Sequence, residues 1–598
     1  MAKMRKFFAM AWLCIRRPGT LFKGIKYLKN NGIKGFLSNM KSRAAFEVSP
    51  ESVQWEVKPE KGPFHGDILF SILMPVYNVE EKWIRKAIDS VKAQTYLEWE
   101  LCIADDCSTK EETREFLRNI KDEQIHVTFL EKNGGISRAT NEAAGLAKGD
   151  YILLMDNDDV LAPYALYEFY KEIKKSDTDI IYSDQDIIDQ YDCHREPLHK
   201  PDFSMDLLLG QMYIGHLLGF KRSLFEASGG FRSEFNGSQD YDLMLRMSRR
   251  AGKIAHIPKI LYSWRDLPSS TAANPESKPY AQTAGLRAVQ EYLDSVYPEG
   301  ASASETEALF VYDVRYPVMK PAKVSVIMPT KDHADLLGAV IKSIEEKTDY
   351  PDYEILILDN NSKEQETFRC FKELQEAYSN VKVIDAPFKF NWSKLNNLGI
   401  TKASGDVFIF MNNDMEVISP EWMQRLAEKA LRKGTGVVGG LLLYEDGTIQ
   451  HAGVVTGIGG WADHIFKGMK PVHYGSPFIS PMVTRNVTAV TGACMAISRE
   501  TIERIGNFDE EFIVCGSDIE ICIRAINRGL VNVYDPYVKL YHYESKSRDA
   551  RDIPEVDFQL SYQMYKNYHN HTDPYYNINL DPESCIPRRR NGQKGTTL

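Results

Sequence analysis

Short apolar runs alternate with helical patterns along most of the chain. Residues 71–75, 101–104 and 151–155 are such runs, and their length is typical of strands that are buried on both faces. The residues between them, for example 81–94, have the spacing of apolar and polar positions expected of a helix. This alternation predicts an α/β fold in which a mainly parallel sheet is covered by helices on both faces.

The same pattern occurs a second time, at 325–329, 355–358 and 407–411. The shift between the copies is nearly constant: 329 − 75 = 254 for the two prolines, and 414 − 158 = 256 for the two aspartates that follow the third run. A constant shift over several landmarks indicates an internal duplication. We therefore expect two tandem α/β domains, which we call the first unit and the second unit.

The composition between and around the copies indicates the domain boundaries. Pro, Gly, Ala and Ser residues around 298–304 favour a loop between the units. The end of the chain has three consecutive arginines and a polar stretch, which favours disorder. The predicted parts are a basic helical N-terminal segment (1–65), the first unit (66–300), a linker (301–320), the second unit (321–552) and a C-terminal tail (553–598).

The overall composition is that of a globular protein, and it excludes some functions. Of the 598 residues, 43% are hydrophobic and 26% are charged, and the formal net charge is −10. A chain with this charge is not expected to bind nucleic acid electrostatically. The nine cysteines form neither a Cys-x-x-Cys pair nor a zinc-ligand spacing, which predicts reduced thiols and a cytoplasmic location.

Residues 1–43 combine basic and large apolar side chains without any acidic residue. Their longest apolar run, residues 7–15, is too short to span a bilayer. Arg16, Arg17 and Pro18 follow it, where a signal peptide would have small residues for cleavage. Two interpretations stay open: peripheral contact with an anionic membrane surface, or a basic solvated helix that packs on the protein.

Acidic side chains follow the third apolar run of each copy. Asp156, Asn157 and Asp158 form an Asp-x-Asp at the end of a predicted strand, where parallel sheets bind their ligands. Carboxylate oxygens suit Mg²⁺ or Mn²⁺ that bridges a diphosphate and neutralises a departing nucleotide. A lone Asp-x-Asp is more often a solvated turn, but its recurrence at Asp414 favours a metal site.

Two further sets of acids have a structural and a functional interpretation. Asp105 and Asp106 end the second run, where they either accept hydrogen bonds from a nucleobase or ribose or cap the next helix. Asp240 and Asp518 stand at the start of predicted helices in the two copies. Either could be a simple helix cap, but the repetition favours a general base that deprotonates an acceptor hydroxyl.

His542 follows an apolar strand in the second copy. It is either a further metal or phosphate ligand or a hydrogen-bonded core residue. Ser263 takes the matching place when the sequences are aligned by Leu-Tyr-Ser and Leu-Tyr-His. A required histidine would therefore have to be replaced in the first unit by water or another group.

Together these motifs resemble glycosyltransferase family 2 over roughly residues 68–580. The second unit is similar to a subgroup with Asn-Asn-Asp in place of Asp-x-Asp, which is common among rhamnosyl- and galactofuranosyl-transferring enzymes. The resemblance implies two GT-A domains. The motifs that carry it are 75–78, 105–106, 156–159, 182–186, 213–216 and 239–243 in the first copy, and 390–397, 412–414, 450–453, 541–545 and 573–577 in the second.

The resemblance also implies a role for each candidate residue. It makes Asp240 and Asp518 the catalytic bases, and Asp158, Asp414 and His542 the metal-site residues, with His542 near the diphosphate. The implied donor-binding residues are Pro75, Tyr77, Asp105, Asp106 and Asp156 in the first unit, and Pro329, Asp359 and Asn412 in the second.

The second unit departs from the family pattern at three positions. Lys331 replaces the tyrosine, Asn360 replaces the second acid of the pair, and Asn412 replaces the first acid of the Asp-x-Asp. These changes are compatible with a different nucleotide sugar in the second unit.

The expected activity is an inverting transfer of sugars, with Mg²⁺ or Mn²⁺ as cofactor, from UDP-, dTDP- or GDP-linked donors. The expected acceptor is a growing surface polysaccharide or lipid-linked glycan, and two sites on one chain suggest a bifunctional enzyme. The alternatives are one active unit beside a non-catalytic acceptor-binding unit, a glycan-binding scaffold without activity, and a nucleotidyltransferase. A Gly-rich phosphate loop with a lysine, which would favour the last, is missing from the sequence.

Overall fold

The computed structural model describes residues 62–267, 279–317, 322–543, 553–565 and 573–590. The described residues all belong to one compact unit within residues 55–598. The predicted helical segment and membrane contact at the N-terminus therefore lie outside the described residues, apart from residues 62–65. In the described part of the chain, no helix is both long and apolar enough to cross a bilayer.

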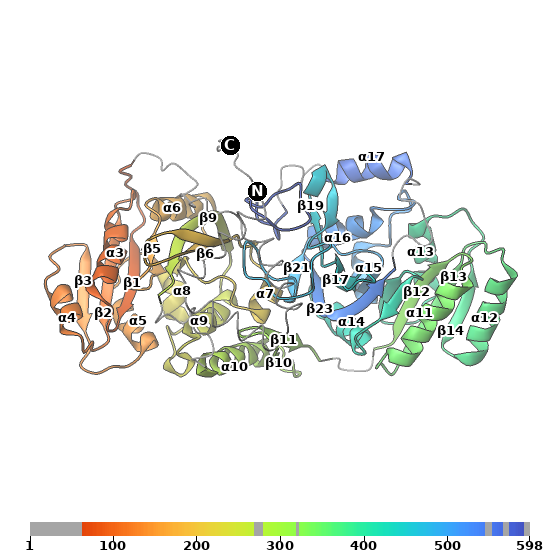
Figure 1. The fold of residues 1–598 in the computed structure, drawn as a ribbon, viewed down its shortest axis with the longest axis horizontal. Coiled ribbons are helices and arrows are strands. Elements are labelled where there is room, and N and C mark those ends of the chain that lie inside the picture. Colours follow the sequence, from red (N-terminus) through yellow and green to blue (C-terminus); the bar gives the residue numbers. More distant parts are fainter. Residues whose placement is uncertain (1–61, 268–278, 318–321, 544–552, 566–572, 591–598) are drawn as a thin grey trace, which may run out of the picture. The chain divides into compact units, whose positions relative to one another are not determined.

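The first unit is built on one sheet with the strand order β3-β2-β1-β4-β8-β6-β9-β5, and β7 pairs with β6 (Figure 1). Its strands are β1 (Phe70–Val76), β2 (Trp99–Asp105), β3 (Ile125–Phe129), β4 (Tyr151–Leu154), β5 (Val160–Leu161), β6 (Ile180–Ile188), β7 (His194–Leu198), β8 (Leu218–Lys221) and β9 (Ile254–Arg265). Its helices are α3 (Glu81–Lys92), α4 (Glu111–Arg118), α5 (Ile136–Ala144), α6 (Ala165–Ser176), α7 (Met205–Gly210), α8 (Arg222–Ala227), η1 (Ser233–Phe235), α9 (Gln239–Ser248) and α10 (Pro279–Val296).

The second unit has the sheet order β14-β13-β12-β15-β22-β17-β23-β16, with β18 paired to β17 and β21 paired to β23. The strands from here on are β12 (Val324–Thr330), β13 (Tyr353–Asp359), β14 (Val381–Asp385), β15 (Val407–Met411), β16 (Met415–Val417), β17 (Thr435–Leu443), β18 (Ile449–His451), β19 (Val454–Thr456), β20 (Ala462–His464), β21 (Arg485–Val487), β22 (Cys494–Ser498) and β23 (Val531–His542). The helices are α11 (Ala334–Lys347), α12 (Gln365–Ala377), α13 (Trp392–Lys402), α14 (Trp422–Ala430), η3 (Ile458–Gly460), α15 (Arg499–Ile505), α16 (Ser517–Asn527) and α17 (Glu555–Met564).

The two sheets have the same strand order along their main path, and the second has one further strand, β21, which pairs with β23. In the first unit Phe70 pairs with Trp99 and Tyr151, and in the second unit Val324 pairs with Tyr353 and Val407. The shifts of 324 − 70 = 254 and 407 − 151 = 256 match those of the sequence motifs. The α/β fold and the duplication are thereby confirmed. The sheets are not wholly parallel: β8 and β22 each run antiparallel to both of their neighbours, and the strands β5, β7, β16, β18 and β21 also pair antiparallel.

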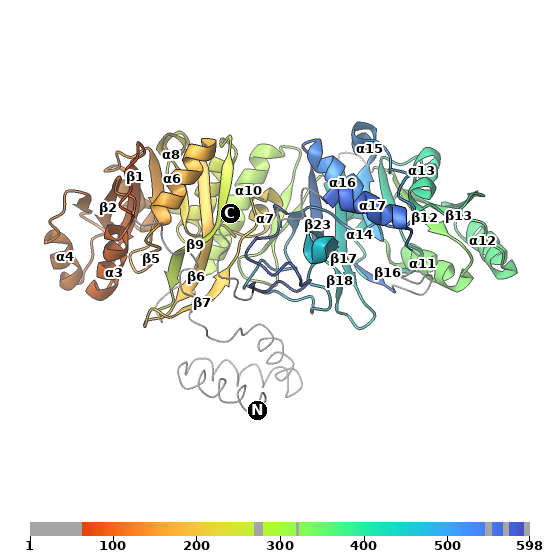
Figure 2. The same cartoon turned by 90° about the horizontal axis from the view of Figure 1, so that it is seen from above.

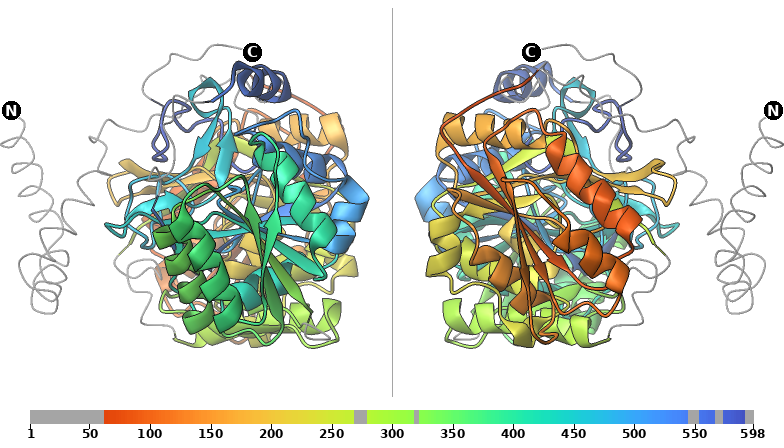
Figure 3. Two further views of the ribbon diagram at one scale, coloured as in Figure 1. Left: turned by 90° about the vertical axis from the view of Figure 1, so that its right-hand side faces the viewer. Right: turned by 90° about the vertical axis from the view of Figure 1, so that its left-hand side faces the viewer.

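Each sheet is buried because the helices on its faces present apolar stripes to it. In α3 the buried side chains recur at Trp83, Ile84, Ala87, Ile88 and Val91, the spacing of one helix face. The runs at 71–74 and 324–328 are buried on both faces, as expected for central strands. Figure 3 shows helices on opposite sides of the strands at the second unit's end of the molecule.

Two predictions about connecting segments are corrected by the structure. The predicted linker at 301–320 contains an antiparallel hairpin of β10 (Ser302–Glu305) and β11 (Tyr312–Arg315). The predicted tail begins with α17, and residues 573–590 contact the rest of the chain: the Asp573 carboxylate accepts from the Thr456 N–H at 2.9 Å and from the Thr488 hydroxyl at 2.7 Å. The prolines and polar residues of the tail are typical of a disordered segment. Its order could not be predicted from them, because the contacts that fix it are made with residues far away in the sequence.

Two candidate active sites

The loop after β4 is anchored on both sides in the first unit. Asn157 Nδ2 donates to the carbonyl oxygen of Pro75 at 2.7 Å, which ties the loop to the end of β1. Asp159 is fully buried and accepts hydrogen bonds from Tyr262 Oη at 2.5 Å and from the Arg265 backbone N–H at 2.7 Å. Asp156 and Asp158 are partly exposed. The strand end therefore holds a fixed loop that carries two accessible carboxylates.

These carboxylates form a strongly acidic cluster. Burial and the charge of Asp156 raise the pKa of Asp158 to about 6, and burial with the two neighbouring acids raises the pKa of Asp159. Clustered carboxylates that repel one another are stabilised by a bound cation, and their hard oxygens are the ligands that Mg²⁺ prefers. The residues present therefore fit a divalent cation.

His216 lies between the acidic loop and the helix-start aspartate of the first unit. Its Nε2 is 3.8 Å from Asp156 Oδ2, and its ring stacks on Tyr262 at a centroid distance of 4.6 Å. Burial lowers the pKa of His216 to about 4, although the nearby Asp240 opposes this. Asp240 follows the first residue of α9, and burial raises its pKa. The structure thus brings Asp156, His216 and Asp240 together.

In the second unit, Asp414 faces His542. The two buried side chains approach to 3.4 Å between Asp414 Oδ1 and His542 Nε2, and the Tyr543 N–H donates to the Asp414 carbonyl oxygen at 3.0 Å. Asp414 Oδ1 and His542 Nδ1 have no hydrogen-bond partner. Such a buried carboxylate–imidazole pair fits a cation that takes its remaining ligands from a diphosphate and water.

Asp518 is the corresponding aspartate at the start of α16. Its carboxylate accepts hydrogen bonds from the N–H groups of Gly492 at 2.8 Å and Ile519 at 3.0 Å, and burial raises its pKa. His464 interacts electrostatically with Asp518, and the rings of His451 and His464 meet edge to face at 4.8 Å. His451 in turn interacts with His542. A row of histidines therefore connects the two acids of this site.

Strand pairing corrects the alignment of His542 with Ser263. Val417 pairs with Leu540 and Leu161 with Tyr262, at equivalent strand positions (417 − 161 = 256). The equivalent of His542 is therefore Trp264, one residue beyond Ser263. The Leu-Tyr match in the sequence was displaced by one residue, because strand register is set by pairing across the sheet. Neither Trp264 nor the buried Ser263, whose hydroxyl donates to Asp186, replaces the imidazole of His542.

Among the described residues, no group of three or more His, Cys, Asp or Glu side chains has an arrangement that could hold a metal alone. The acids that the sequence predicted as metal ligands, Asp158 and Asp414, lie in different units. Each site therefore offers only part of a coordination sphere, and a bound cation would depend on substrate oxygens.

The predicted donor-binding acids of the first unit are held by the protein itself. Both Asp106 oxygens accept backbone hydrogen bonds, from Gly134 at 2.7 Å and from Gly135 at 2.8 Å. Asp105 is buried and accepts from the Ser108 N–H. Both therefore brace loops in this structure, and a contact with the donor stays a prediction. Tyr77, with 49% of its surface exposed, is available to stack on a ligand.

The second unit has the equivalent strand ends with different polar groups. Asp359 Oδ1 accepts from the Ser362 N–H at 3.0 Å, as Asp105 does from Ser108. Pro329, the partner of Leu358 in the sheet, precedes Thr330, whose hydroxyl accepts from Asn413. Asn412 is partly exposed, and its backbone N–H donates to Ala493.

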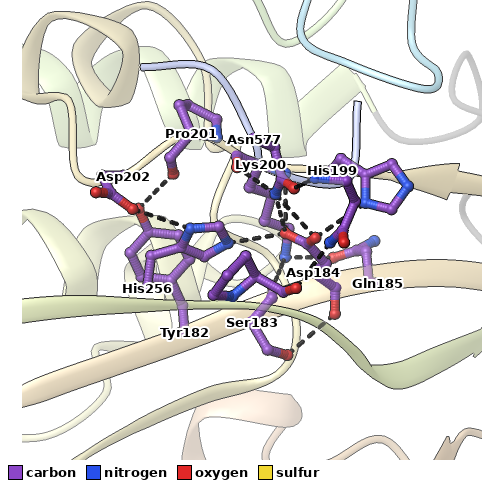
Figure 4. Close-up of polar contacts among 12 residues, drawn as sticks. Tyr182, Ser183, Asp184, Gln185, His199, Lys200, Pro201, Asp202, His256 and Asn577 are labelled. Carbon is purple, nitrogen blue, oxygen red and sulfur yellow. Dashed lines mark hydrogen bonds and ion pairs between the residues drawn. The ribbon is translucent and has the colours of Figure 1, made fainter. Parts of the chain in front are cut away.

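A buried polar network next to the first site was not predicted from the sequence (Figure 4). The Asp184 carboxylate contacts His199 at 3.0 Å, His256 at 2.8 Å and the Lys200 N–H at 2.9 Å. Asn577, from the predicted tail, donates to both Asp184 oxygens at 2.9 and 3.1 Å. The sequence motifs containing Asp184 and Asn577 carried no hint that they meet, because 393 residues separate them.

This network supports the segment that carries His216. Lys200 Nζ donates to the carbonyl oxygens of His216 at 2.6 Å and Ser183 at 2.7 Å, and also to that of Ile214. Gln185 Oε1 accepts from both Lys200 Nζ and the His216 N–H. The position of His216 near Asp156 and Asp240 therefore depends on the Asp184 network, and Asn577 completes that network from the C-terminal segment.

The family model described as "Glycosyl transferase family 2" matches residues 71–229 and 325–506, more than half of the chain. An uncharacterised protein of Sinorhizobium fredii is 40% identical over 523 residues, covering 86% of this chain and 57% of its own length. The O-antigen biosynthesis protein RfbC of Myxococcus xanthus is 38% identical over 528 residues, covering 87% of this chain and 41% of its own length. The chain thus spans about half the length of these relatives.

Solved structures resemble parts of the chain more distantly. A crystal structure of residues 1–349 of S. aureus TarS is 20% identical with a TM-score of 0.31, over 38% of this chain and 66% of that one. The extent of the family match and the identity to the relatives establish the family for both units. The chain belongs to glycosyltransferase family 2.

Proposed function

We propose that this protein is a bifunctional inverting glycosyltransferase with one active site in each unit. The observation that carries the proposal is shared by both units: one acid follows a central strand, one aspartate stands at a helix start, and each of these acids has a histidine near it. Ligands bind beyond the carboxyl ends of the strands in open α/β sheets. The repetition of these acids in both units of one chain supports two transfers rather than one.

The proposed chemistry is a single displacement at the anomeric carbon of a nucleotide sugar. Asp240 or Asp518 takes the proton of an acceptor hydroxyl, and the hydroxyl oxygen forms a bond to the anomeric carbon. The bond from that carbon to the diphosphate breaks on the opposite face, its electron pair leaves with the nucleoside diphosphate, and the anomeric configuration inverts. Burial raises the pKa of both aspartates, which makes each carboxylate a stronger base.

The proposed cofactor is Mg²⁺ or Mn²⁺. Asp156 and Asp158 would hold it in the first unit, and Asp414 with His542 in the second. When bound, the ion would stabilise the negative charge of the leaving diphosphate. These carboxylates and the imidazole are partly or fully buried, and charges interact more strongly there than in water.

UDP-, dTDP- or GDP-linked sugars are the proposed donors, and the proposed acceptor is a growing surface polysaccharide or lipid-linked glycan. The similarity to a relative named for O-antigen biosynthesis supports such an acceptor. Residues 1–43 would hold the enzyme peripherally at the cytoplasmic face. Deleting them should release the protein from vesicles of anionic lipid; unchanged binding would disprove this role.

The second candidate function has one active unit and one that only binds acceptor. The observation that favours it is the asymmetry of the sites: the first has the acidic cluster without a histidine like His542, and the second has that histidine but Asn412 in place of an acid. Asp158→Ala and Asp414→Ala, made separately, distinguish the two functions. Bifunctionality requires each variant to lose a different transfer.

The test is to follow nucleoside diphosphate release from UDP-, dTDP- and GDP-sugars with Mn²⁺ or Mg²⁺, for the wild type and for Asp240→Asn and Asp518→Asn. We expect two donors to react. The rate of nucleoside diphosphate release from each should fall by about 10²- to 10⁴-fold in a different variant, the usual effect of removing a general base. The activity of each site should fall as the pH drops through a pKa above the ordinary aspartate value. One reactive donor, abolished by only one variant, contradicts bifunctionality.

A further inference from the structure

An exposed group of aromatic side chains lies beside the second site. Trp461, Phe558 and Tyr562 expose 38%, 45% and 58% of their surfaces. The ring of Trp461 meets those of Phe558, Tyr562 and the buried Tyr565 edge to face, at 5.7, 6.3 and 6.5 Å. We call these four residues the aromatic platform. Large apolar side chains that gather on a surface usually mark a binding site.

The platform is assembled from two segments with defined backbones. Phe558, Tyr562 and Tyr565 follow one another at the spacing of a single face of α17 and the residue after it. Trp461 follows η3, and its carbonyl oxygen accepts from the Gly457 N–H at 2.6 Å. Gly457 has a φ of 100°, which only glycine adopts easily. The tryptophan is therefore presented by a tight turn and not by a loose loop.

Both segments lead to the candidate base Asp518. From Trp461 the chain runs through β20 to His464, which interacts with Asp518. From the other side, Tyr565 also interacts with Asp518, whose charge adds to burial in raising the pKa of Tyr565. Helix α17 lies close to the start of α16, the helix that begins at Ser517, and Figure 2 shows the two next to each other. The platform therefore borders the place where an acceptor hydroxyl must lie.

Helix α17 is also locked to the loop that precedes the base. The Asp557 carboxylate accepts the N–H groups of Ile513, Val514 and Cys515 at 2.8, 2.7 and 3.0 Å. At Gly516, a Cβ atom would lie 2.7 Å from the hydroxyl oxygen of Ser561, so the helix approaches this loop closely. The platform and Asp518 are thus held in a fixed relation by backbone contacts.

We propose that the aromatic platform binds the acceptor sugar of the second unit. This rests on the proposed function, since it places a subsite next to the base of that function. A pyranose has an apolar face of C–H groups that lies well on aromatic rings, and rigid rings lose little conformational entropy when they bind. A membrane surface is the less favoured occupant: α17 exposes Glu555 in its first turn and has no basic residue in its last turn, so it offers anionic headgroups no attraction.

The first unit offers a different surface at the corresponding place. Helix α10 follows β9 as α17 follows β23, and it also packs on the loop before its unit's base: Ser238 Oγ donates to the Ala281 carbonyl oxygen at 2.7 Å. The one exposed aromatic side chain on the described part of α10 is Tyr280. The platform is therefore specific to the second unit, and the two transfers differ in how strongly they hold the acceptor.

The experiment uses the full chain and methyl glycosides of glucose, galactose, rhamnose and N-acetylglucosamine as probes. Saturation-transfer NMR should show contact of the wild type with the C–H face of at least one glycoside, and Trp461→Ala should remove it. In the Asp518-dependent reaction, Trp461→Ala and the double variant Phe558→Ala/Tyr562→Ala should raise the acceptor KM by about 10-fold. The donor KM should not change, and Trp461→Phe should recover most of the affinity.

Phe368→Ala is the matched control, because Phe368 is an equally exposed aromatic residue on α12 of the same unit. It should leave both KM values unchanged. An unchanged acceptor KM in Trp461→Ala, or no saturation transfer to any glycoside, overturns the platform even when Asp518→Asn abolishes transfer. Loss of binding to vesicles of neutral or anionic lipid in Trp461→Ala would also overturn it, in favour of a membrane contact. If Asp518→Asn keeps full activity, the proposed function itself is wrong.

Discussion

Asp106 of the first unit and Asn360 of the second occupy the same place after the second strand, and both are buried. Asp106 accepts two hydrogen bonds from the N–H groups of Gly134 and Gly135. Asn360 Nδ2 instead donates two, to the carbonyl oxygens of Ala386 and Phe388 at 2.9 and 2.8 Å. The neighbouring loop presents N–H donors in the first unit and carbonyl acceptors in the second. The residue at this position therefore matches the hydrogen-bonding groups of that loop. The substitution at this position is therefore no evidence for a different donor sugar.

The histidines of the two candidate sites differ in the elements that carry them. His216 lies five residues before Lys221, which pairs with Tyr151; the residue at this place in the second unit is Ala493, five before Ser498, which pairs with Val407. The second unit has its imidazoles at His451, the last residue of β18, and at His542, the last residue of β23. The two sites therefore reach similar electrostatics from different elements.

Other parts of the two units are nearly identical. Ser71 donates to Glu100 and accepts from the Gly149 N–H, and Ser325 does the same with Glu354 and Gly405. These buried contacts lie at the opposite ends of the strands from the candidate sites. Contacts that only hold the sheet were kept in both copies, whereas the surroundings of the ligand edge diverged.

Exchanging the residue types at Asp106 and Asn360 should have the largest effect among the changes that test this comparison. Asn360→Asp places a carboxylate against two carbonyl oxygens in a buried position, which should lower the free energy of unfolding of the second unit by about 3–5 kcal/mol. Asp106→Asn should cost the first unit about 1–3 kcal/mol, because one of the two N–H groups that Asp106 accepts would face an amide NH2 group in place of an acceptor. Urea unfolding monitored by the activity of each unit measures both.

The loss of unfolding free energy in Asn360→Asp should grow from pH 5 to pH 8. Burial raises the pKa of the new carboxyl in the folded state, so the unfolded chain releases its proton more readily as the pH rises, and the folded state becomes less stable relative to it. Asn361→Asp is the control: Asn361 is exposed and also donates to Phe388. Equal effects of the buried and exposed variants would show that loop polarity does not select the residue at position 360.

His216→Ala makes the first site more like the second, which has Ala493 in that place. We expect the Asp240-dependent transfer to fall by about 10²-fold, the effect of a small displacement of reacting groups. The Asp518-dependent transfer should be unchanged. Steady-state kinetics with each donor tests this, and His473→Ala, in an exposed histidine outside both sites, serves as a control. An equal loss at both sites would mean that His216 supports folding and not the site.

Asn577→Ala should have the smallest effect and the most specific one. It removes the hydrogen bonds to Asp184 and should cost about 1–3 kcal/mol of stability in the network. Although residue 577 follows the second unit in sequence, we expect a loss of Asp240-dependent activity with normal Asp518-dependent activity. Asn579→Ala, which removes only a bond to the Pro258 carbonyl oxygen, is the control. A loss confined to the second site would contradict the role of the Asp184 network.

The tandem duplication, the strand ends and the acidic motifs could be predicted from the sequence because they depend on local patterns. Asp156, Asp158 and Asp414 stand directly after buried strands, and Asp240 and Asp518 stand at helix starts, so their edge of the sheet followed from the α/β pattern. The register of His542 could not be predicted, since a shift of one residue leaves the apolar pattern of a mostly buried strand almost unchanged.

The sequence by itself determined the fold of each unit and the acids at its ligand edge, because strand and helix periodicities and strand-end motifs are encoded in neighbouring residues. Only the tertiary structure decided which distant groups complete each site. Asp106 is held by the loop between β3 and α5, Asn577 reaches the first unit, and Trp461 meets α17. These contacts join residues that are far apart in the chain, and the free energy that selects them comes from burial and from the pairing of polar groups in the folded protein.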